Sequence, residues 1–209
     1  MRHNRLLLPL SLIGAAGGAV GAFVVLAKRV NAHETKTLDA RARRQFPRRR
    51  RRATRRAAEI VAPLGKWFAQ VPLGLGVATI LWRTNRKAGA LSVAGASATA
   101  ASLAWLLEQT MTPRKPPPGR HSPTEPAFPS GHAFQTSALA WTAAYVLVRE
   151  GMMDGRTAVP VAVIFPASAG LVKLYLDKHW FTDVLGGYLL GATIAASAAA
   201  AYESMRPGS

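Results

Sequence analysis

The fold is decided by residues 129–187, which read PSGHAFQTSALAWTAAYVLVREGMMDGRTAVPVAVIFPASAGLVKLYLDKHWFTDVLGG. This stretch contains two apolar runs, Ala133–Val148 and Ala158–Leu176, joined by a short polar turn from Arg149 to Arg156. Each run approaches the ~20 residues that a helix needs to cross a bilayer. Neither run shows the polar face, recurring every ~3.6 residues, that a water-soluble helix carries. The stretch therefore predicts two consecutive membrane-spanning helices.

Four further apolar runs lie outside this stretch. They are Leu6–Ala27, Leu64–Trp82, Ala88–Leu107 and Val184–Tyr202. Several of them are dominated by Ala and Gly, small residues that let helices approach closely inside lipid. With the two central runs they predict an all-α protein, a polytopic transmembrane helical bundle of about six spans.

The first apolar run has a second interpretation. Leu6–Ala27 holds 22 residues without a charge and follows Arg2 and Arg5, as the apolar core of a secretory signal peptide does. The apolar core of a signal peptide is only ~7–15 residues long. The length therefore favours a retained membrane helix, with a cleaved signal peptide as the alternative.

The composition limits the binding partners and the kinds of site that the protein can have. The 209 residues are 49% hydrophobic and include 27 Lys and Arg against 10 Asp and Glu, a formal net charge of +17. Such an excess favours nucleic acid or an anionic membrane surface as a neighbour. The absence of cysteine excludes disulfides, zinc-thiolate sites and cysteine nucleophiles.

The basic residues concentrate between the first two apolar runs, where ten arginines fall between Arg41 and Arg56. Next to a membrane, each basic residue contributes about 1 kcal/mol to the binding of anionic lipid. We therefore expect Arg41–Arg56 to contact anionic headgroups. Nucleic acid is not an expected partner, because the segment has no interleaved aromatic residues. We expect the chain to divide into an N-terminal span with its arginine-rich interfacial segment, 1–60, and a helical bundle, 61–209, which contains the candidate chemistry described next.

Three polar clusters carry candidate chemistry, and the last of them contains Lys173, His179 and Asp183. His179 and Asp183 are four residues apart, so on a helix they would share one face. A carboxylate that accepts from one ring nitrogen fixes the tautomer of an imidazole and makes the other nitrogen a better nucleophile. The alternative is a structural His–Asp pair that caps a helix at the membrane interface.

The second cluster is the sequence Pro129-Ser130-Gly131-His132, directly before an apolar run. At a loop that enters a helix, the backbone N–H groups of Ser130 and Gly131 could point at an anion. Glycine allows the backbone to approach a phosphate closely, and His132 would stand beside it as a proton donor. The alternative is an N-capping serine followed by a helix-starting glycine.

The first cluster is the cationic, proline-rich loop from Lys115 to Pro123. It shares one inter-span loop with the second cluster, and two spans separate that loop from the third cluster. An even number of crossings returns the chain to the same membrane face. The three clusters are therefore expected to meet at one interface.

Together these residues resemble the type 2 phosphatidic acid phosphatase (PAP2) family, which shares its active site with vanadium-dependent haloperoxidases. The pattern of that family is K-x6-R-P, then P-S-G-H, then S-R-x5-H-x3-D, and the resemblance covers roughly Lys115–Gly187. It implies that His179 attacks phosphorus to form a phosphohistidine, with Asp183 as its orienting group, and that His132 protonates the leaving group. It also implies that Lys115, Ser130, Gly131 and Lys173 bind the phosphate oxygens, without a metal or other cofactor.

The sequence departs from this pattern in two of its motifs. Ser122 stands where the family has arginine, and Val172-Lys173 stands where it has Ser-Arg. Lysine keeps the positive charge but lacks the bidentate fork of arginine. We expect Arg120, in the same loop as Ser122, to supply the missing guanidinium.

The resemblance implies an integral membrane phosphatase whose substrate keeps its tail in the bilayer. Polyprenyl phosphates or diphosphates, phosphatidic acid and phosphatidylglycerol phosphate all meet this condition. The alternatives are a catalytically weak or silent relative that binds anionic lipid, and a haloperoxidase, against which the spans argue because those relatives are soluble. Oligomeric state stays open.

The Ala- and Arg-rich composition suggests a bacterial source, and hence a multi-pass protein of the inner membrane. Two spans separate the arginine run from the first cluster, so both lie on one face, which the positive-inside tendency makes cytoplasmic. Bacterial relatives of the family usually open outward, and the opposite face also carries basic residues such as Arg83 and Arg86.

Overall fold

The computed structural model describes residues 4–46, 52–111, 114–117 and 128–206. Throughout these residues the regular structure is helical, which confirms the all-α prediction. In chain order the elements are α1 Asn4–Asn31, α2 Lys36–Arg44, α3 Arg52–Val61, the 3-10 helix η1 Ala62–Gly65, α4 Trp67–Arg83, α5 Lys87–Thr110, α6 Gly131–Arg149, α7 Gly155–Tyr175 and α8 Phe181–Met205.

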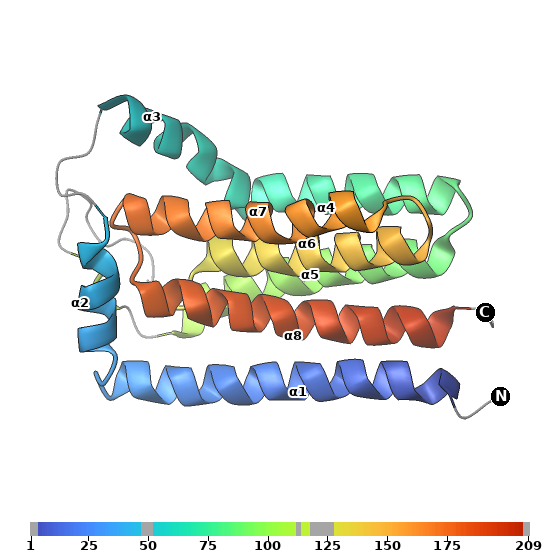
Figure 1. Cartoon of the computed structure of the whole chain (residues 1–209), viewed down its shortest axis with the longest axis horizontal. Helices are drawn as coiled ribbons and strands as arrows, with labels where there is room; N and C mark the ends of the chain where they lie inside the picture. Colours follow the sequence, from blue (N-terminus) through green and yellow to red (C-terminus); the bar gives the residue numbers. More distant parts are fainter. Residues whose placement is uncertain (1–3, 47–51, 112–113, 118–127, 207–209) are drawn as a thin grey trace.

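The long helices lie side by side, and the chain runs back and forth between two ends of the bundle (Figure 1). Helix α6 is central and packs against α4, α5, α7 and α8, while α1 packs along α8. The core between α4, α5, α6 and α8 includes Leu81, Val93, Val146 and Tyr202, none of which has exposed surface. This arrangement leaves α6 shielded from the surroundings over most of its length.

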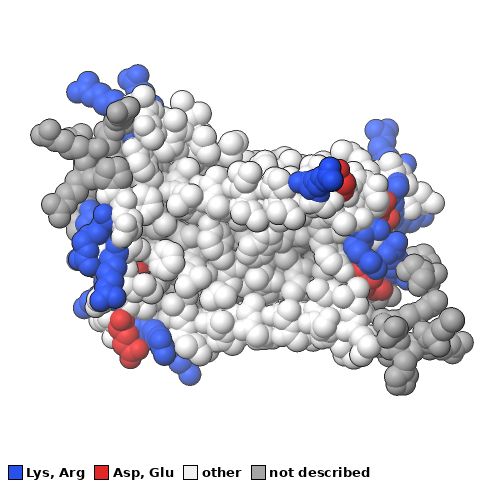
Figure 2. Space-filling view, in the orientation of Figure 1, with Lys and Arg blue, Asp and Glu red and all other residues white. Residues whose placement is uncertain are grey.

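The outer surface suits lipid rather than water. On α7, Val159, Val163 and Phe165 are all more than half exposed. Figure 2 shows Lys and Arg gathered at the two ends of the molecule, with few charges on the surface between them. Water-soluble proteins rarely expose apolar surface on this scale. The bundle therefore presents an apolar belt to the membrane between two charged ends.

Among the residues that the structure describes, four helices are long and apolar enough to cross a bilayer, namely α1, α5, α7 and α8. A fifth span forms if α3 with η1 and α4, which meet at a bend of 57°, count as one broken crossing. Helix α6 is less apolar, but it needs no lipid-facing surface because its neighbours surround it. These helices match the predicted multi-pass bundle of about six spans.

The two ends of the bundle differ in what they carry. Helix α2 lies at the end where α6 and α8 begin, whereas both chain termini lie at the opposite end (Figure 1). Residues 47–51, which hold most of the Arg48–Arg52 run, lie outside the described residues. The arrangement brings the second and third polar clusters to one end, as the parity of the spans predicts.

Candidate active site

The third cluster lies where α8 begins. Trp180 is the N-cap residue, and its N–H donates to the Asp183 carboxylate at 2.7 Å. His179 precedes this cap, so the expectation that His179 and Asp183 share the face of one helix is wrong. The two side chains still meet across the helix start, with Nδ1 of His179 3.8 Å from Oδ2 of Asp183. This distance exceeds a hydrogen bond, and such catalytic contacts often shorten only when substrate binds.

The second cluster lies where α6 begins, directly beside the third. The N–H of Ser130 donates to the backbone carbonyl of Asp183 at 2.9 Å. The Ser130 N–H is therefore already engaged, which corrects the expectation that it points at an anion. The close approach of α8 to this turn depends on Gly187, because a Cβ on it would lie 2.6 Å from the Ser130 carbonyl oxygen.

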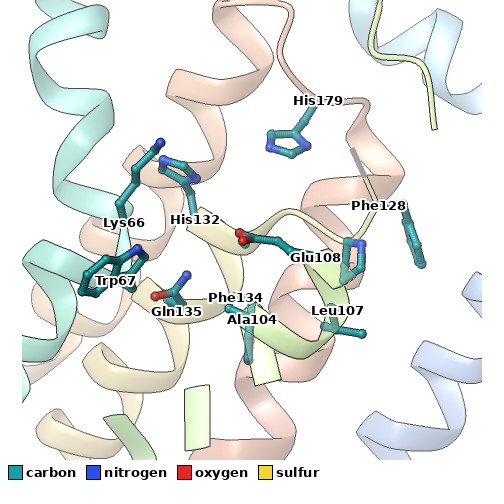
Figure 3. Close-up of a pocket in the computed structure, with 12 residues that line it drawn as sticks. Lys66, Trp67, Ala104, Leu107, Glu108, Phe128, His132, Phe134, Gln135 and His179 are labelled. Atoms are coloured by element: carbon teal, nitrogen blue, oxygen red, sulfur yellow. The ribbon is translucent and has the colours of Figure 1, made fainter. Parts of the chain in front are cut away.

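The two histidines face one cavity of about 120 Å³ at this end of the bundle. Figure 3 shows His132, from α6, and His179, from the turn before α8, around a shared space with Lys66 and Glu108. The cavity wall combines charged, polar and apolar side chains with the glycine of the second cluster. Its residues are Lys66, Trp67, Ala104, Leu107, Glu108, Phe128, Pro129, Gly131, His132, Phe134, Gln135 and His179.

Two polar atoms of the cavity wall could form hydrogen bonds with a bound molecule. Nε2 of His132 and Oε1 of Gln135 are buried and have no hydrogen-bond partner among the described residues. Buried polar atoms without partners are rare in folded proteins. Their position on a cavity wall indicates that a bound molecule completes their hydrogen bonds.

The cations of the site differ in part from those expected. Lys66, which precedes α4 and has no motif around it, lines the cavity. Lys173 is buried in the last turn of α7 but is not part of the cavity wall. The Lys115 side chain is exposed, and its backbone carbonyl accepts a 3.0 Å hydrogen bond from Nε1 of Trp180. Arg120 and Ser122 lie outside the described residues.

A second, apolar groove of about 460 Å³ lies next to the cavity. Residues of η1, α4, α6 and α7 form its walls, including Leu73, Phe165 and Val172. Gly65 belongs to this groove and touches the cavity as well, since a Cβ on it would lie 2.9 Å from Cδ2 of His132. An apolar tail in the groove would thus end beside His132.

Asp183 itself is fully buried and is held from two sides. Besides the Trp180 N–H, its carboxylate accepts a hydrogen bond from the Arg114 guanidinium. Arg114 also pairs with Asp39 of α2, at 2.7 Å. Neither residue belongs to a motif in the sequence. The only signal for Asp39 is that it is an acidic residue within a strongly basic segment.

No cluster of three or more potential metal-binding side chains occurs in the part of the chain that the structure describes. The arrangement instead provides two imidazoles, one of them beside a carboxylate, together with a lysine at the cavity. An imidazole backed by a carboxylate can act as a nucleophile, and a second imidazole can transfer a proton. The geometry is thus suited to group transfer to and from histidine.

Comparison with known proteins agrees with this arrangement. The family model described as PAP2 superfamily matches residues 90–206, which contain both histidines and Asp183. No curated protein sequence matches the chain. Among solved structures, the chain is similar to a transmembrane PAP2-type phosphatidylglycerolphosphate phosphatase from Bacillus subtilis. The TM-score is 0.72 at 22% sequence identity, over 86% of this chain and 92% of that one.

Proposed function

The chain belongs to the PAP2 superfamily, and on this premise we propose that it is an integral membrane phosphatase that removes phosphate from a membrane lipid. The observation that carries the proposal is the single cavity that His132 and His179 share, with Asp183 next to His179. A protein that only binds anionic lipid would not need a nucleophile with an orienting carboxylate.

In the first step, His179 attacks the phosphorus atom of the substrate. Its Nδ1 faces Asp183, which leaves Nε2 for the reaction. The bond between phosphorus and the leaving oxygen breaks, and protonated His132 donates a proton to that oxygen. The product is a phosphohistidine at position 179 and the dephosphorylated lipid.

In the second step, water attacks the phosphorus atom of the phosphohistidine. His132, now neutral, accepts a proton from the attacking water, and the bond between phosphorus and Nε2 of His179 breaks. Inorganic phosphate leaves, and both histidines return to their starting states. Asp183 stabilises the positive charge that His179 gains after its attack.

Positive charge and backbone N–H groups stabilise the phosphate oxygens in the transition state. We assign this role to Lys66 and Gly131, which line the cavity. The family pattern also indicates Lys115, Ser130 and Lys173, although Lys115 and Lys173 do not line the cavity in this structure. Arg120 is our own candidate for the guanidinium that the pattern has at position 122. For Ser130 the available group is the hydroxyl, which is buried and has no hydrogen-bond partner among the described residues.

The apolar groove beside His132 supports a substrate with a hydrocarbon tail. The phosphate enters the cavity at the end of the bundle where α6 and α8 begin, while the tail stays in the apolar groove. Phosphatidylglycerol phosphate, phosphatidic acid and polyprenyl phosphates or diphosphates all have this form. The first of these is the substrate in the name of the similar Bacillus subtilis enzyme.

We place the protein in the bacterial inner membrane with the site end at the cytoplasmic face. The support is the positive-inside tendency, applied to the arginines of α2 and α3 at that end. The same arginines, within Arg41–Arg56, are suited to binding anionic headgroups. A reporter fused at the C-terminus lies at the opposite end and reads the face opposite the site.

The test is phosphate release from a panel of these lipids in detergent by the purified wild type, His179→Ala and Lys36→Ala. Lys36 is an exposed cation of α2 and serves as the control. We expect release by the wild type and the control, and at least about a 10³-fold loss for His179→Ala. Lipid binding without release from any member of the panel would identify a silent relative instead.

A further inference from the structure

A buried acidic residue of α2, Asp39, reaches the active site. Asp39 of α2 is 2% exposed, and both of its carboxylate oxygens accept hydrogen bonds. One accepts from the N–H of Thr182 at 2.9 Å, and the other from the Thr182 hydroxyl at 2.9 Å and the Thr35 hydroxyl at 3.2 Å. Asp39 therefore anchors α2 to the first turn of α8, next to Asp183.

Arg114 joins this carboxylate to that of Asp183. One guanidinium nitrogen donates to Asp39 at 2.7 Å. The other donates to the Asp183 carboxylate and, at 3.0 Å, to the Thr182 hydroxyl. The guanidinium also lies over the Trp180 ring, 5.8 Å from its centroid. The planar fork of arginine allows such contact with two carboxylates at once, which lysine does not.

We propose that Asp39 and Arg114 are positioning residues, which hold the Asp183 carboxylate in place beside His179 so that α2 forms part of the active site. The inference rests on the phosphatase activity proposed above. It assigns Arg114 a role distinct from that of a phosphate ligand, because Arg114 does not line the cavity and each of its two terminal nitrogens donates to a carboxylate.

Charge balance supports this role. Arg114 alone would offset the negative charge that Asp183 presents to His179. Asp39 compensates the Arg114 charge, so the group of three keeps one net negative charge beside the imidazole. Removal of one partner from a buried charged group leaves the other uncompensated, which is strongly unfavourable. We therefore expect the variants of the two residues to act through the same route.

The test compares Arg114→Lys, Asp39→Asn and the double variant in full-length protein. The readouts are kcat and KM for a lipid phosphate in mixed micelles and the inhibition constant of inorganic phosphate. Mutation of a residue that orients a functional group without contacting the substrate typically lowers activity by about 10- to 100-fold. We expect kcat to fall by that factor in each single variant, with KM and the phosphate inhibition constant within about twofold of wild type. The kcat of the double variant should be no lower than that of the less active single variant, because both changes release the same carboxylate.

Two further variants distinguish a positioning role of Arg114 from direct binding of phosphate. Lys66→Ala removes a cation of the cavity wall and should raise the phosphate inhibition constant, whereas Lys36→Ala changes an exposed cation of α2 and should match wild type. An Arg114→Lys variant that behaves like Lys66→Ala would overturn the proposal, since Arg114 would then be a phosphate ligand. Full kcat in both single variants would overturn it as well.

Folding is checked by size-exclusion chromatography in detergent. If Asp39→Asn does not yield folded protein, Thr35→Val replaces it, because that change removes only the 3.2 Å hydrogen bond to Asp39. A fall in kcat of about two- to fivefold at unchanged KM supports the proposal, and unchanged kcat overturns it. Wild-type protein that releases no phosphate contradicts the proposed function, while active wild type with unaffected variants contradicts only this inference.

Discussion

The N–H of Ser130 donates a 2.9 Å hydrogen bond to the backbone carbonyl of Asp183. This bond joins the start of α6 to the start of α8, so that the turn beside His132 and the carboxylate beside His179 have a common support.

Along the chain 46 residues lie between His132 and His179, whereas in the fold their two turns are hydrogen-bonded neighbours. The positions of both histidines therefore depend on how closely α6 and α8 approach.

Gly187 sets that approach. A Cβ at this position would lie 2.6 Å from the Ser130 carbonyl oxygen and 2.9 Å from Cβ of Ala133. Gly187→Ala should separate the two helix starts and destabilise the fold by about 1–3 kcal/mol, as overpacking of a tight interface does. The measurement is the apparent melting temperature in detergent, together with kcat. The control is Gly95→Ala, because a Cβ on Gly95 meets nothing within 4 Å. Equal stability of the two variants would contradict the close approach.

Gly65 offers a test of the position of His132. A Cβ on Gly65 would lie 2.9 Å from Cδ2 of His132, so Gly65→Ala should displace the imidazole. A small misplacement of a reacting group can reduce turnover by about 10- to 100-fold. We expect kcat to fall by this factor in Gly65→Ala while the melting temperature stays near that of wild type. An unchanged kcat would show that His132 does not need the space beside Gly65.

Lys66 tests the assignment of the phosphate-binding cavity. Removal of a charge-assisted hydrogen bond to phosphate weakens binding by about 1.5–3 kcal/mol. Lys66→Ala should therefore raise the inhibition constant of inorganic phosphate at least about tenfold. Lys36→Ala, which changes an exposed cation at the same end of the bundle, is the matched control. Equal inhibition constants for the two variants would place phosphate outside this cavity.

A substitution at Glu203 tests whether a change far from the site lowers stability without lowering turnover. Near the end of α8, opposite the site, Glu203 accepts two hydrogen bonds from Arg149, at 2.7 and 2.9 Å, and one from the Tyr145 hydroxyl at 2.8 Å. Glu203→Gln should lower the free energy of unfolding by about 1–2 kcal/mol, discounted because Arg149 is partly exposed. The melting temperature should fall by a few degrees, whereas kcat measured well below the melting temperature should not change. A reduced kcat at that temperature would show that Glu203 also affects turnover.

The bundle and both histidine motifs are predictable from the sequence because their signals are local. Apolar runs predict spans. The short motif Pro129–His132 predicts a proton donor, and the spacing His179–Asp183 predicts a nucleophile with an orienting carboxylate. The place of His179 before α8 is not predictable from the spacing, because the four-residue separation fits both a helix and a helix start. Only the N-cap at Trp180 decides between them.

The supporting residues are not predictable for a different reason. Lys66 reaches the cavity only because η1 ends directly before it, and Asp39 reaches Thr182 only because α2 packs against the start of α8. Each of these residues acts through a contact with a part of the chain far away in sequence. Composition alone makes the segment of Asp39 look like a uniformly cationic surface, which hides its buried carboxylate.

The most direct test of the central claim is the capture of the phosphorylated enzyme. Purified protein is mixed with a lipid phosphate labelled with ³²P, quenched within milliseconds and mapped by mass spectrometry. We predict label on His179 in the wild type, stable to base and labile to acid, and no label in His179→Ala. Turnover without a labelled His179, or label on another residue, would contradict the account.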